Sequence, residues 1–235
     1  DDLMDFSSLE EPRSQLQQVV LPEGATRRIL AAVDQHDRFL QKREEWGFND
    51  VIQYGKGIAM LFHGPPGTGK TMTAHAIAHH LGKRVLNVDI PTFLDHRESD
   101  RFLPALFRES RLRGAVLFFD ECEALFASRQ LGNNLMNVLL TELEQFEGLA
   151  IMATNSPQVL DPALERRLMV RVSFPRPSQQ ARAEIWRQHI PPQAPLNPDV
   201  DLEDLAIRFD LTGGYIKNAV LMALARAVQS GRDQI

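Results

Sequence analysis

The sequence predicts an α/β protein, with a parallel sheet of five strands followed by a small helical domain. Five apolar runs of strand length alternate with segments of helical spacing, at residues 58–62, 84–88, 115–119, 149–153 and 169–174. Continuous apolar strands separated by helices are typical of a parallel sheet covered on both faces. After residue 174 the pattern becomes helical. We therefore expect an α/β domain over residues 1–177 and a helical domain over residues 178–235.

The helices are expected in a regular order. A helical lead-in over residues 23–45 comes first, with Ile29 and Val33 at helical spacing. Further helices separate the strands at 70–81, 102–112 and 134–146. A proline-rich stretch that closes on Ser178 ends the last strand and starts the next helix.

Composition limits the class of protein. Of the 235 residues, 43% are hydrophobic and 24% are charged, which is ordinary for a globular domain. No apolar run reaches the roughly 18–20 residues of a membrane helix, and the acidic start does not resemble a signal peptide. The net charge of −5 argues against a dedicated nucleic-acid binder. The single Cys122 excludes an internal disulfide and suits a reducing, cytoplasmic setting.

A phosphate-binding motif follows the first apolar run. Residues 64–71 match G-x-x-x-x-G-K-[ST] between a strand and a helix. The glycines let successive backbone N–H groups point at a phosphate, and the helix N-terminus adds positive potential. Lys70 can reach the β- and γ-phosphates of ATP, and Thr71 can ligate Mg²⁺. The residues expected to contact the nucleotide are Gly64, Pro65, Pro66, Gly67, Thr68, Gly69, Lys70, Thr71 and Met72.

Two adjacent acids end the third apolar run. Buried charge is costly unless it is paired or bound to a metal, so Asp120 and Glu121 at the end of a buried strand indicate a functional role. Asp120 fits a Mg²⁺ site, and Glu121 is placed to act as general base on the attacking water. A strand that runs into an acidic helix N-cap would give the same pair. We interpret the next two residues, Cys122 and Glu123, as structural.

Together with two later segments, these motifs resemble the AAA branch of the AAA+ ATPase family over nearly all of residues 15–230. Residues 152–155, Met-Ala-Thr-Asn, look like its sensor-1 segment. The resemblance implies a P-loop NTPase sheet of strand order 5-1-4-3-2 with a helical lid. It also implies that Asn155 orients the attacking water or touches the γ-phosphate. A polar cap at the strand end is the alternative for Asn155.

The resemblance also implies arginine fingers and a ring. Residues 160–167, Leu-Asp-Pro-Ala-Leu-Glu-Arg-Arg, look like the stretch whose arginines reach the nucleotide of a neighbouring subunit. Arg166 sits at the better-matching position and Arg167 is the second candidate, unless both form a basic surface pair. Gly213 and Gly214 resemble the start of the third lid helix, where Thr212 suits an N-cap and glycines admit adenine or ribose. The implied partner is the same chain, in a hexameric ring.

The function expected from this resemblance is a Mg²⁺-dependent ATPase that remodels a protein partner or assembly. A nucleic-acid motor or loader on the same core is one alternative, which the acidic charge disfavours. A scaffold that binds ATP without turnover is another. Glu121, Asn155 and Arg166 together argue against the scaffold.

Two further segments narrow the expectation. Residues 89–101 lack the aromatic–hydrophobic–Gly triplet of threading relatives, and Phe93-Leu94 is the only plausible gripping pair. The segment 127–134 is short for a second pore loop. We therefore expect rearrangement of a folded partner and not processive threading. His75 and His79 have zinc-ligand spacing, but Ala76 replaces the glutamate of a metalloprotease, so we expect surface histidines there.

Overall fold

The computed structural model describes residues 2–21, 24–52, 54–96, 99–128, 134–156 and 162–235. The chain divides into two compact units. Residues 1–64 and 70–173 form the first, which we call the sheet unit. Residues 65–69 and 174–235 form the second, the helical unit. The phosphate-loop segment 65–69 thus groups with the helices, although it lies within the stretch that the sequence assigned to the α/β domain.

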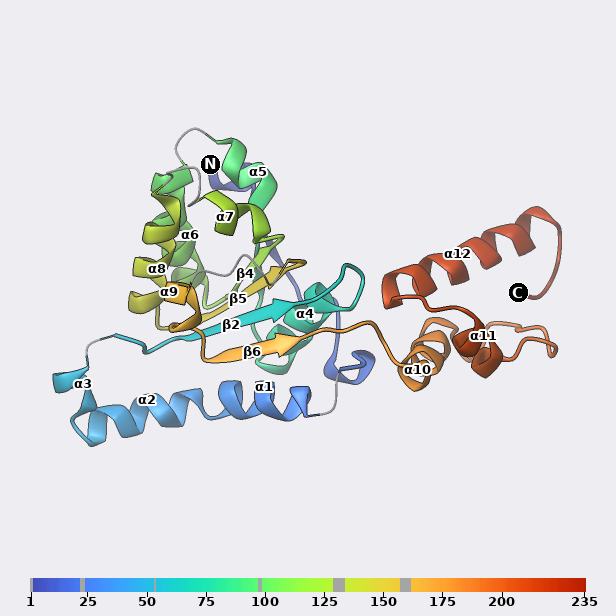
Figure 1. The fold of residues 1–235 in the computed structure, drawn as a ribbon, viewed down its shortest axis with the longest axis horizontal. Coiled ribbons are helices and arrows are strands. Elements are labelled where there is room, and N and C mark those ends of the chain that lie inside the picture. Colours follow the sequence, from blue (N-terminus) through green and yellow to red (C-terminus); the bar gives the residue numbers. More distant parts are fainter. Residues whose placement is uncertain (1, 22–23, 53, 97–98, 129–133, 157–161) are drawn as a thin grey trace. The chain divides into compact units, whose positions relative to one another are not determined.

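The sheet unit contains most of the secondary structure (Figure 1). Its strands are β1 (Ser7–Glu10), β2 (Ile58–His63), β3 (Val85–Asp89), β4 (Val116–Asp120), β5 (Leu149–Thr154) and β6 (Val170–Ser173). Its α-helices are α1 (Ala25–Asp34), α2 (His36–Glu45), α3 (Phe48–Val51), α4 (Lys70–His80), α5 (Ile90–Asp95), α6 (Ser99–Arg113), α7 (Glu123–Ser128), α8 (Leu135–Gln145) and α9 (Pro162–Glu165). Two 3₁₀ turns, η1 (Asp2–Asp5) and η2 (Leu16–Gln18), lie near the start.

The α/β class is confirmed, and the sheet is mostly parallel. The strand order is β1-β3-β4-β5-β2-β6, and the pairs from β3 to β6 all run parallel. The expectation of five strands is wrong, because β1 adds a sixth strand, antiparallel to β3. The short polar run Ser-Ser-Leu-Glu carries no strand pattern of its own. Its extended form comes from pairing with the open edge of β3, which a sequence pattern does not reveal.

Both faces of the sheet are buried, as the apolar strands require. Alternate strand residues such as Leu61, Leu117 and Met152 pack against α5 to α8 in one large cluster. The intervening residues, such as Met60 and Phe62, are also fully buried, on the opposite face with the apolar sides of α1 and α4. Helices therefore cover both sides of the strands (Figure 1). This burial fixes the carboxyl ends of β2, β4 and β5 at one edge of the sheet.

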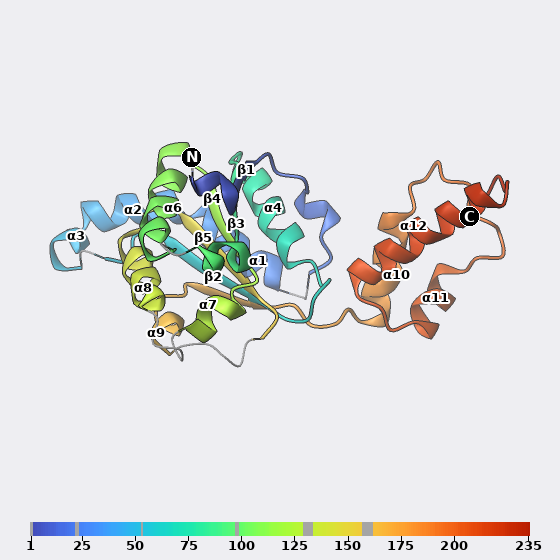
Figure 2. The same ribbon diagram turned by 90° about the horizontal axis from the view of Figure 1, so that it is seen from above.

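The helical unit contains α10 (Gln179–His189), α11 (Leu202–Arg208) and α12 (Gly213–Gln229), which Figure 2 shows grouped together. Their shared core is Ala183, Trp186, Ala206 and Ile216. The hydroxyl of Ser178 accepts a hydrogen bond from the amide of Ala181 at 3.2 Å and caps α10, as its position predicts. Among the described residues, no helix combines the length and apolarity that crossing a membrane requires.

Four local expectations need correction or placement. The lead-in is two helices, α1 and α2, separated at Gln35, whose φ of −97° and ψ of 0° depart from regular helix values. His75 is buried with 5% of its surface exposed, so it is not a surface histidine; its Nε2 lies 3.9 Å from Oε2 of Glu10, at the end of β1. Phe93 is fully buried and meets the ring of Phe6 edge-on at 5.2 Å between centroids. Residues 97–98 and 129–133 of the two candidate pore loops, and residues 160–161 of the arginine-finger stretch, lie outside the described residues.

Candidate nucleotide-binding site

The candidate residues of the sheet unit gather where three neighbouring strands end. β4, β5 and β2 are adjacent and parallel, so their carboxyl ends share one edge. Asp120 ends β4, Asn155 directly follows β5, and Lys70 begins α4 after β2. The amide of Gly64 donates to the carbonyl of Thr154 at 3.2 Å and ties the first loop residue to β5. Residues far apart in the sequence thus meet at one site.

Lys70 is held at the centre of this edge. Its Nζ donates to the Gly64 carbonyl at 2.7 Å and to Asn155 Oδ1 at 2.9 Å. Only 7% of Lys70 is exposed. Burial lowers the pKa of the ammonium, and the nearby carboxylates of Asp120 and Glu123 act in the opposite direction. A buried cation directly after a glycine-rich loop suits an anionic ligand such as a phosphate.

Thr71 and Asp120 form the pair expected around a magnesium ion. The Thr71 hydroxyl donates to Asp120 Oδ2 at 2.8 Å, and the Glu121 amide donates to Asp120 Oδ1 at 3.0 Å. Mg²⁺ prefers oxygen ligands and is commonly held by one or two protein groups together with phosphates and water. Among the described residues, no group of three or more His, Cys, Asp or Glu residues could hold a metal by itself. The donor set therefore fits a magnesium ion that arrives with a nucleotide.

Glu121 stands out by its backbone. Its φ of 55° is the only positive value among the described residues other than glycine. This left-handed conformation is uncommon and costs free energy in a residue with a side chain. The following amide, of Cys122, donates to the Ala153 carbonyl at 2.9 Å and holds the turn to β5. The exposed Glu121 side chain is thereby separated from Asp120, which faces Thr71.

Glu123 contacts the candidate catalytic residues, a role that the sequence analysis missed. Its Oε1 accepts from the Asn155 Nδ2 at 2.9 Å, and its Oε2 accepts from the Asn155 backbone amide at 3.2 Å. Burial raises the pKa of Glu123, but hydrogen bonds from its own amide, Asn155 and Thr154 outweigh it, and the net shift is downward. The presence of three acids within the four residues 120–123 was the feature of the sequence that could have pointed to a role for Glu123 in the site.

The phosphate-loop segment 65–69 contacts the start of α12 within the helical unit. The amide of Gly214 donates to the carbonyl of Gly67 at 3.0 Å. A Cβ on Gly67, whose φ is 73°, would lie 2.7 Å from Thr212 Oγ1. Thr212 takes the N-cap position of α12, but its hydroxyl makes no capping bond and is buried without a partner. The structure thus brings Gly213 and Gly214 to the loop in which Pro65, Pro66 and Thr68 also lie.

The two candidate arginines have different surroundings. Arg167 donates to the Ala163 carbonyl at 2.7 Å and forms an ion pair with Glu144 of α8. Arg166, at the turn after α9, has an exposed side chain. Arg167 is thus engaged within its own chain, whereas Arg166 is directed to solvent.

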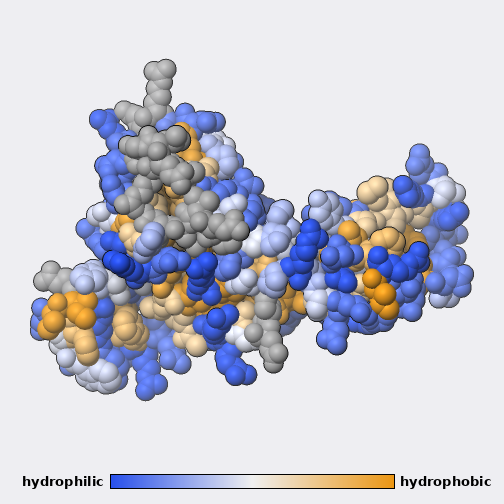
Figure 3. Space-filling model, viewed as in Figure 1, coloured by the Kyte–Doolittle hydropathy of each residue, from blue (hydrophilic) through white to orange (hydrophobic). Residues whose placement is uncertain are grey.

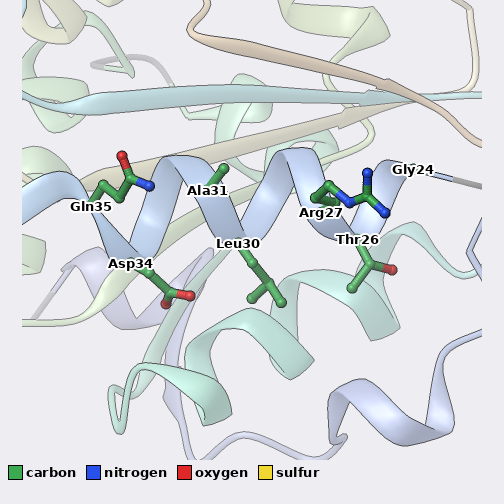
Figure 4. Close-up of a pocket in the computed structure, with 7 residues that line it drawn as sticks. All are labelled: Gly24, Thr26, Arg27, Leu30, Ala31, Asp34 and Gln35. Atoms are coloured by element: carbon green, nitrogen blue, oxygen red, sulfur yellow. The ribbon is translucent and has the colours of Figure 1, made fainter.

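A groove outside this site runs along α1 (Figure 4). It is lined by Gly24, Thr26, Arg27, Leu30, Ala31, Asp34 and Gln35. The close-up shows Leu30 and Asp34 directed toward the neighbouring helix and not toward the strand ends. None of the candidate residues lines it.

A parallel sheet with a glycine-rich loop before a helix and an acidic pair on a neighbouring strand defines a P-loop nucleotide-binding protein. Residues 60–176 match the model of the "ATPase family associated with various cellular activities (AAA)", and the chain belongs to this family.

Similar curated proteins support the same family membership. A cell division cycle protein 48 homolog of Archaeoglobus fulgidus is 37% identical over 179 residues, which is 70% of this chain and 24% of the relative. A proteasome-associated ATPase of Acidothermus cellulolyticus is 33% identical over 70% of this chain and 33% of the relative. A katanin p60 ATPase-containing subunit A1 of Strongylocentrotus purpuratus is 30% identical over 80% of this chain and 40% of the relative. The chain thus spans less than half the length of these relatives.

Proposed function

We propose that this chain binds Mg²⁺ and ATP, hydrolyses the nucleotide within a hexameric ring of identical subunits, and uses the cycle to remodel a protein partner. The observation that carries the proposal is the meeting of Lys70, Thr71, Asp120 and Asn155 at one edge of the sheet. The membership in an ATPase family supports the same chemistry.

Each residue has a role in this proposal. Lys70 and the amides of residues 64–72 hold the phosphates, with Gly213 and Gly214 beside the loop. Thr71 and Asp120 hold the magnesium ion, which would neutralise phosphate charge when bound. Glu121 accepts the proton of the attacking water, because its carboxylate is exposed and separate from the pair at Asp120. Arg166 stabilises the transition-state charge at the nucleotide of the adjacent subunit.

Self-association is supported by exposed apolar side chains. In the sheet unit, Trp46, Val51 and Tyr54 are 69%, 83% and 62% exposed, and Figure 3 shows hydrophobic surface around α3. In the helical unit, Met222 and Val228 of α12 are 58% and 72% exposed. Exposed apolar groups of this kind mark protein–protein contacts. Contacts between two different patches build rings, because each subunit offers one patch to each neighbour.

Rearrangement of a folded partner, and not threading, remains the proposed action. Of the candidate gripping pair, Phe93 is fully buried against Phe6, and Leu94 is half-buried and packs against the same core, which disfavours a pore-lining role. The net charge of −5 supports a protein partner over nucleic acid.

The test combines two substitutions. Lys70→Ala should abolish binding of a fluorescent ADP analogue, because the buried cation meets phosphate charge in the ground state. Glu121→Gln should keep that binding and lower phosphate release by at least about a hundredfold, because Glu121 acts on the water in the transition state. Wild-type turnover in Glu121→Gln would reject the general base. Phosphate release that DNA or RNA stimulates, and protein partners do not, would favour the nucleic-acid motor. Binding without any turnover of the wild type would favour the scaffold.

A further inference from the structure

Asn155 lies between two groups of opposite charge, one at each end of its side-chain amide. On one side, Glu123 accepts from Asn155 Nδ2 at 2.9 Å. On the other, Lys70 Nζ donates to Asn155 Oδ1 at 2.9 Å. The second oxygen of Glu123 accepts from the Asn155 backbone amide at 3.2 Å, so the carboxylate holds both the main chain and the side chain.

These neighbours leave one orientation for the amide. A carboxylate offers only acceptors, and an ammonium offers only donors. With the amide turned over, its carbonyl would face the carboxylate and its NH₂ group would face the ammonium. Both contacts would then be repulsive. The hydrogen bonds that outweigh burial and lower the pKa of Glu123 keep the carboxylate ionised at neutral pH.

The position of Glu123 depends on the turn before it. Glu121 adopts a left-handed conformation, and Cys122 is fixed to β5 through the Ala153 carbonyl. Glu123 then begins α7 with its carboxylate directed back to the residue that follows β5. The same turn therefore presents Glu121 to solvent and Glu123 to Asn155.

We propose that Glu123 is a positioning residue that fixes the Asn155 amide with Oδ1, and not the NH₂ group, toward Lys70. This inference rests on the proposed ATP hydrolysis. It decides whether Asn155 orients the attacking water or contacts the γ-phosphate in that reaction. An oxygen held beside the phosphate-binding lysine accepts a hydrogen bond from the attacking water. It donates none to a γ-phosphate oxygen. Glu123 thus acts through Asn155 and not on the substrate.

A reciprocal exchange tests this arrangement. In Glu123→Gln, an NH₂ group replaces one of the two acceptors that face Asn155. In Asn155→Asp, two carboxylates face each other. Each single variant should lower kcat by about tenfold or more, the size expected for a coupled hydrogen bond. The apparent nucleotide affinity in Glu123→Gln should stay within about twofold of wild type, because Glu123 does not contact the phosphates.

The double variant Glu123→Gln/Asn155→Asp restores the pattern. The introduced glutamine can donate to the introduced carboxylate and accept from the backbone amide beside it, and that carboxylate still presents an oxygen to Lys70. We expect kcat at least about fivefold above either single variant. Glu109→Gln, at a half-buried glutamate of α6 that pairs with Arg113 away from the site, is the control for loss of one acid. Thermal unfolding of each variant separates a structural loss from a catalytic one. A double variant no more active than the weaker single variant would overturn the proposal.

A second measurement does not depend on turnover. In protein labelled with ¹⁵N-asparagine and free of nucleotide, the Asn155 side-chain NH₂ signal should be shifted and protected from exchange with water. It should move toward solvent-exposed values in Glu123→Gln. An Asn155 signal that Glu123→Gln leaves unchanged overturns the proposal even if ATP is hydrolysed. An inactive wild type with the expected signal would reject the proposed hydrolysis and keep the arrangement.

Discussion

Arg167 forms an ion pair with Glu144 of α8, while its neighbour Arg166 leaves its side chain exposed. The Arg167 guanidinium also donates to the Ala163 carbonyl one turn earlier, which fixes the end of α9 against α8. Two consecutive arginines on a tight turn point in different directions, so one can serve the fold and the other can serve a neighbouring molecule. We therefore expect separate consequences when each is removed.

Arg166 is expected to act on the site of an adjacent subunit. Arg166→Ala should be nearly inactive, because an arginine finger contributes about 10³–10⁵ in rate. Lys70→Ala should be nearly inactive as well, because it does not bind the nucleotide. Mixed in equal amounts, the two variants should regain activity, because an intact site then meets an intact Arg166 in about a quarter of random contacts. Phosphate release by the mixture checks this. An Arg166→Ala protein that hydrolyses ATP normally by itself would refute the assignment.

Arg167→Ala is the matched control for that mixture. Its ion pair with Glu144 is partly exposed, at 26% and 38% of the two side chains, so its loss should lower the free energy of unfolding by about 1 kcal/mol or less. Urea denaturation measures this, and Arg166→Ala should leave the midpoint unchanged. Equal effects of the two substitutions on stability would contradict their separate roles.

Replacing Glu121 by glycine should make the fold more stable and abolish hydrolysis. Because its φ of 55° suits glycine better than glutamate, Glu121→Gly should raise the free energy of unfolding by about 1 kcal/mol while hydrolysis is lost. Glu121→Gln keeps the strained backbone and serves as the control that loses only the carboxylate. Denaturation curves of the two variants decide. A Glu121→Gly protein less stable than Glu121→Gln would show that strain does not govern this turn.

Gly214 should be more sensitive than Gly213. A Cβ on Gly214 would lie 3.2 Å from Gly67 Cα, so the phosphate loop would have to shift, whereas a Cβ on Gly213 meets the Gly67 carbonyl at 3.4 Å. We expect Gly214→Ala to weaken binding of a fluorescent ADP analogue by several-fold more than Gly213→Ala does. Equilibrium titration of both variants checks the order. The reverse order would mean that the Gly67 contact does not shape the binding loop.

His75 should make stability depend on pH. Burial lowers the pKa of His75, which the carboxylate of Glu10 partly opposes. The unfolded chain therefore takes up a proton near the ordinary pKa of 6.5, while the folded chain does so only at lower pH. The free energy of unfolding should thus fall as the pH drops through 6.5. In His75→Leu this fall should be shallower, with the exposed His79→Leu as control. Parallel slopes for both variants and wild type would contradict this.

Much of the site follows from the sequence alone, for a physical reason. The loop at residues 64–71 and the pair Asp120-Glu121 are short segments in which local spacing determines geometry, so residue type and order are enough to predict that Lys70, Thr71 and Asp120 lie at one end of the sheet. The alternation of apolar runs predicted a parallel α/β sheet because burial on both faces leaves a continuous pattern.

Other features depend on contacts between distant segments and could not be inferred in this way. Glu123 was interpreted as structural because its partner, Asn155, follows 32 residues later. β1 has no apolar alternation and exists through its pairing with β3. The contact of Gly67 with Gly214 joins a loop and a helix that no sequence pattern relates.

The antiparallel strand β1 has a consequence for any shortened form of this protein. Ser7–Glu10 covers the edge of β3, and Phe6 just before it packs on Phe93 and Phe102. A chain that began after Arg13 would expose a row of unpaired backbone groups beside a bared aromatic surface, and such an edge recruits strands from other molecules. We expect a chain truncated there to aggregate although its nucleotide site is intact. Inactivity of such a fragment would then reflect its low solubility and not a defect in the site.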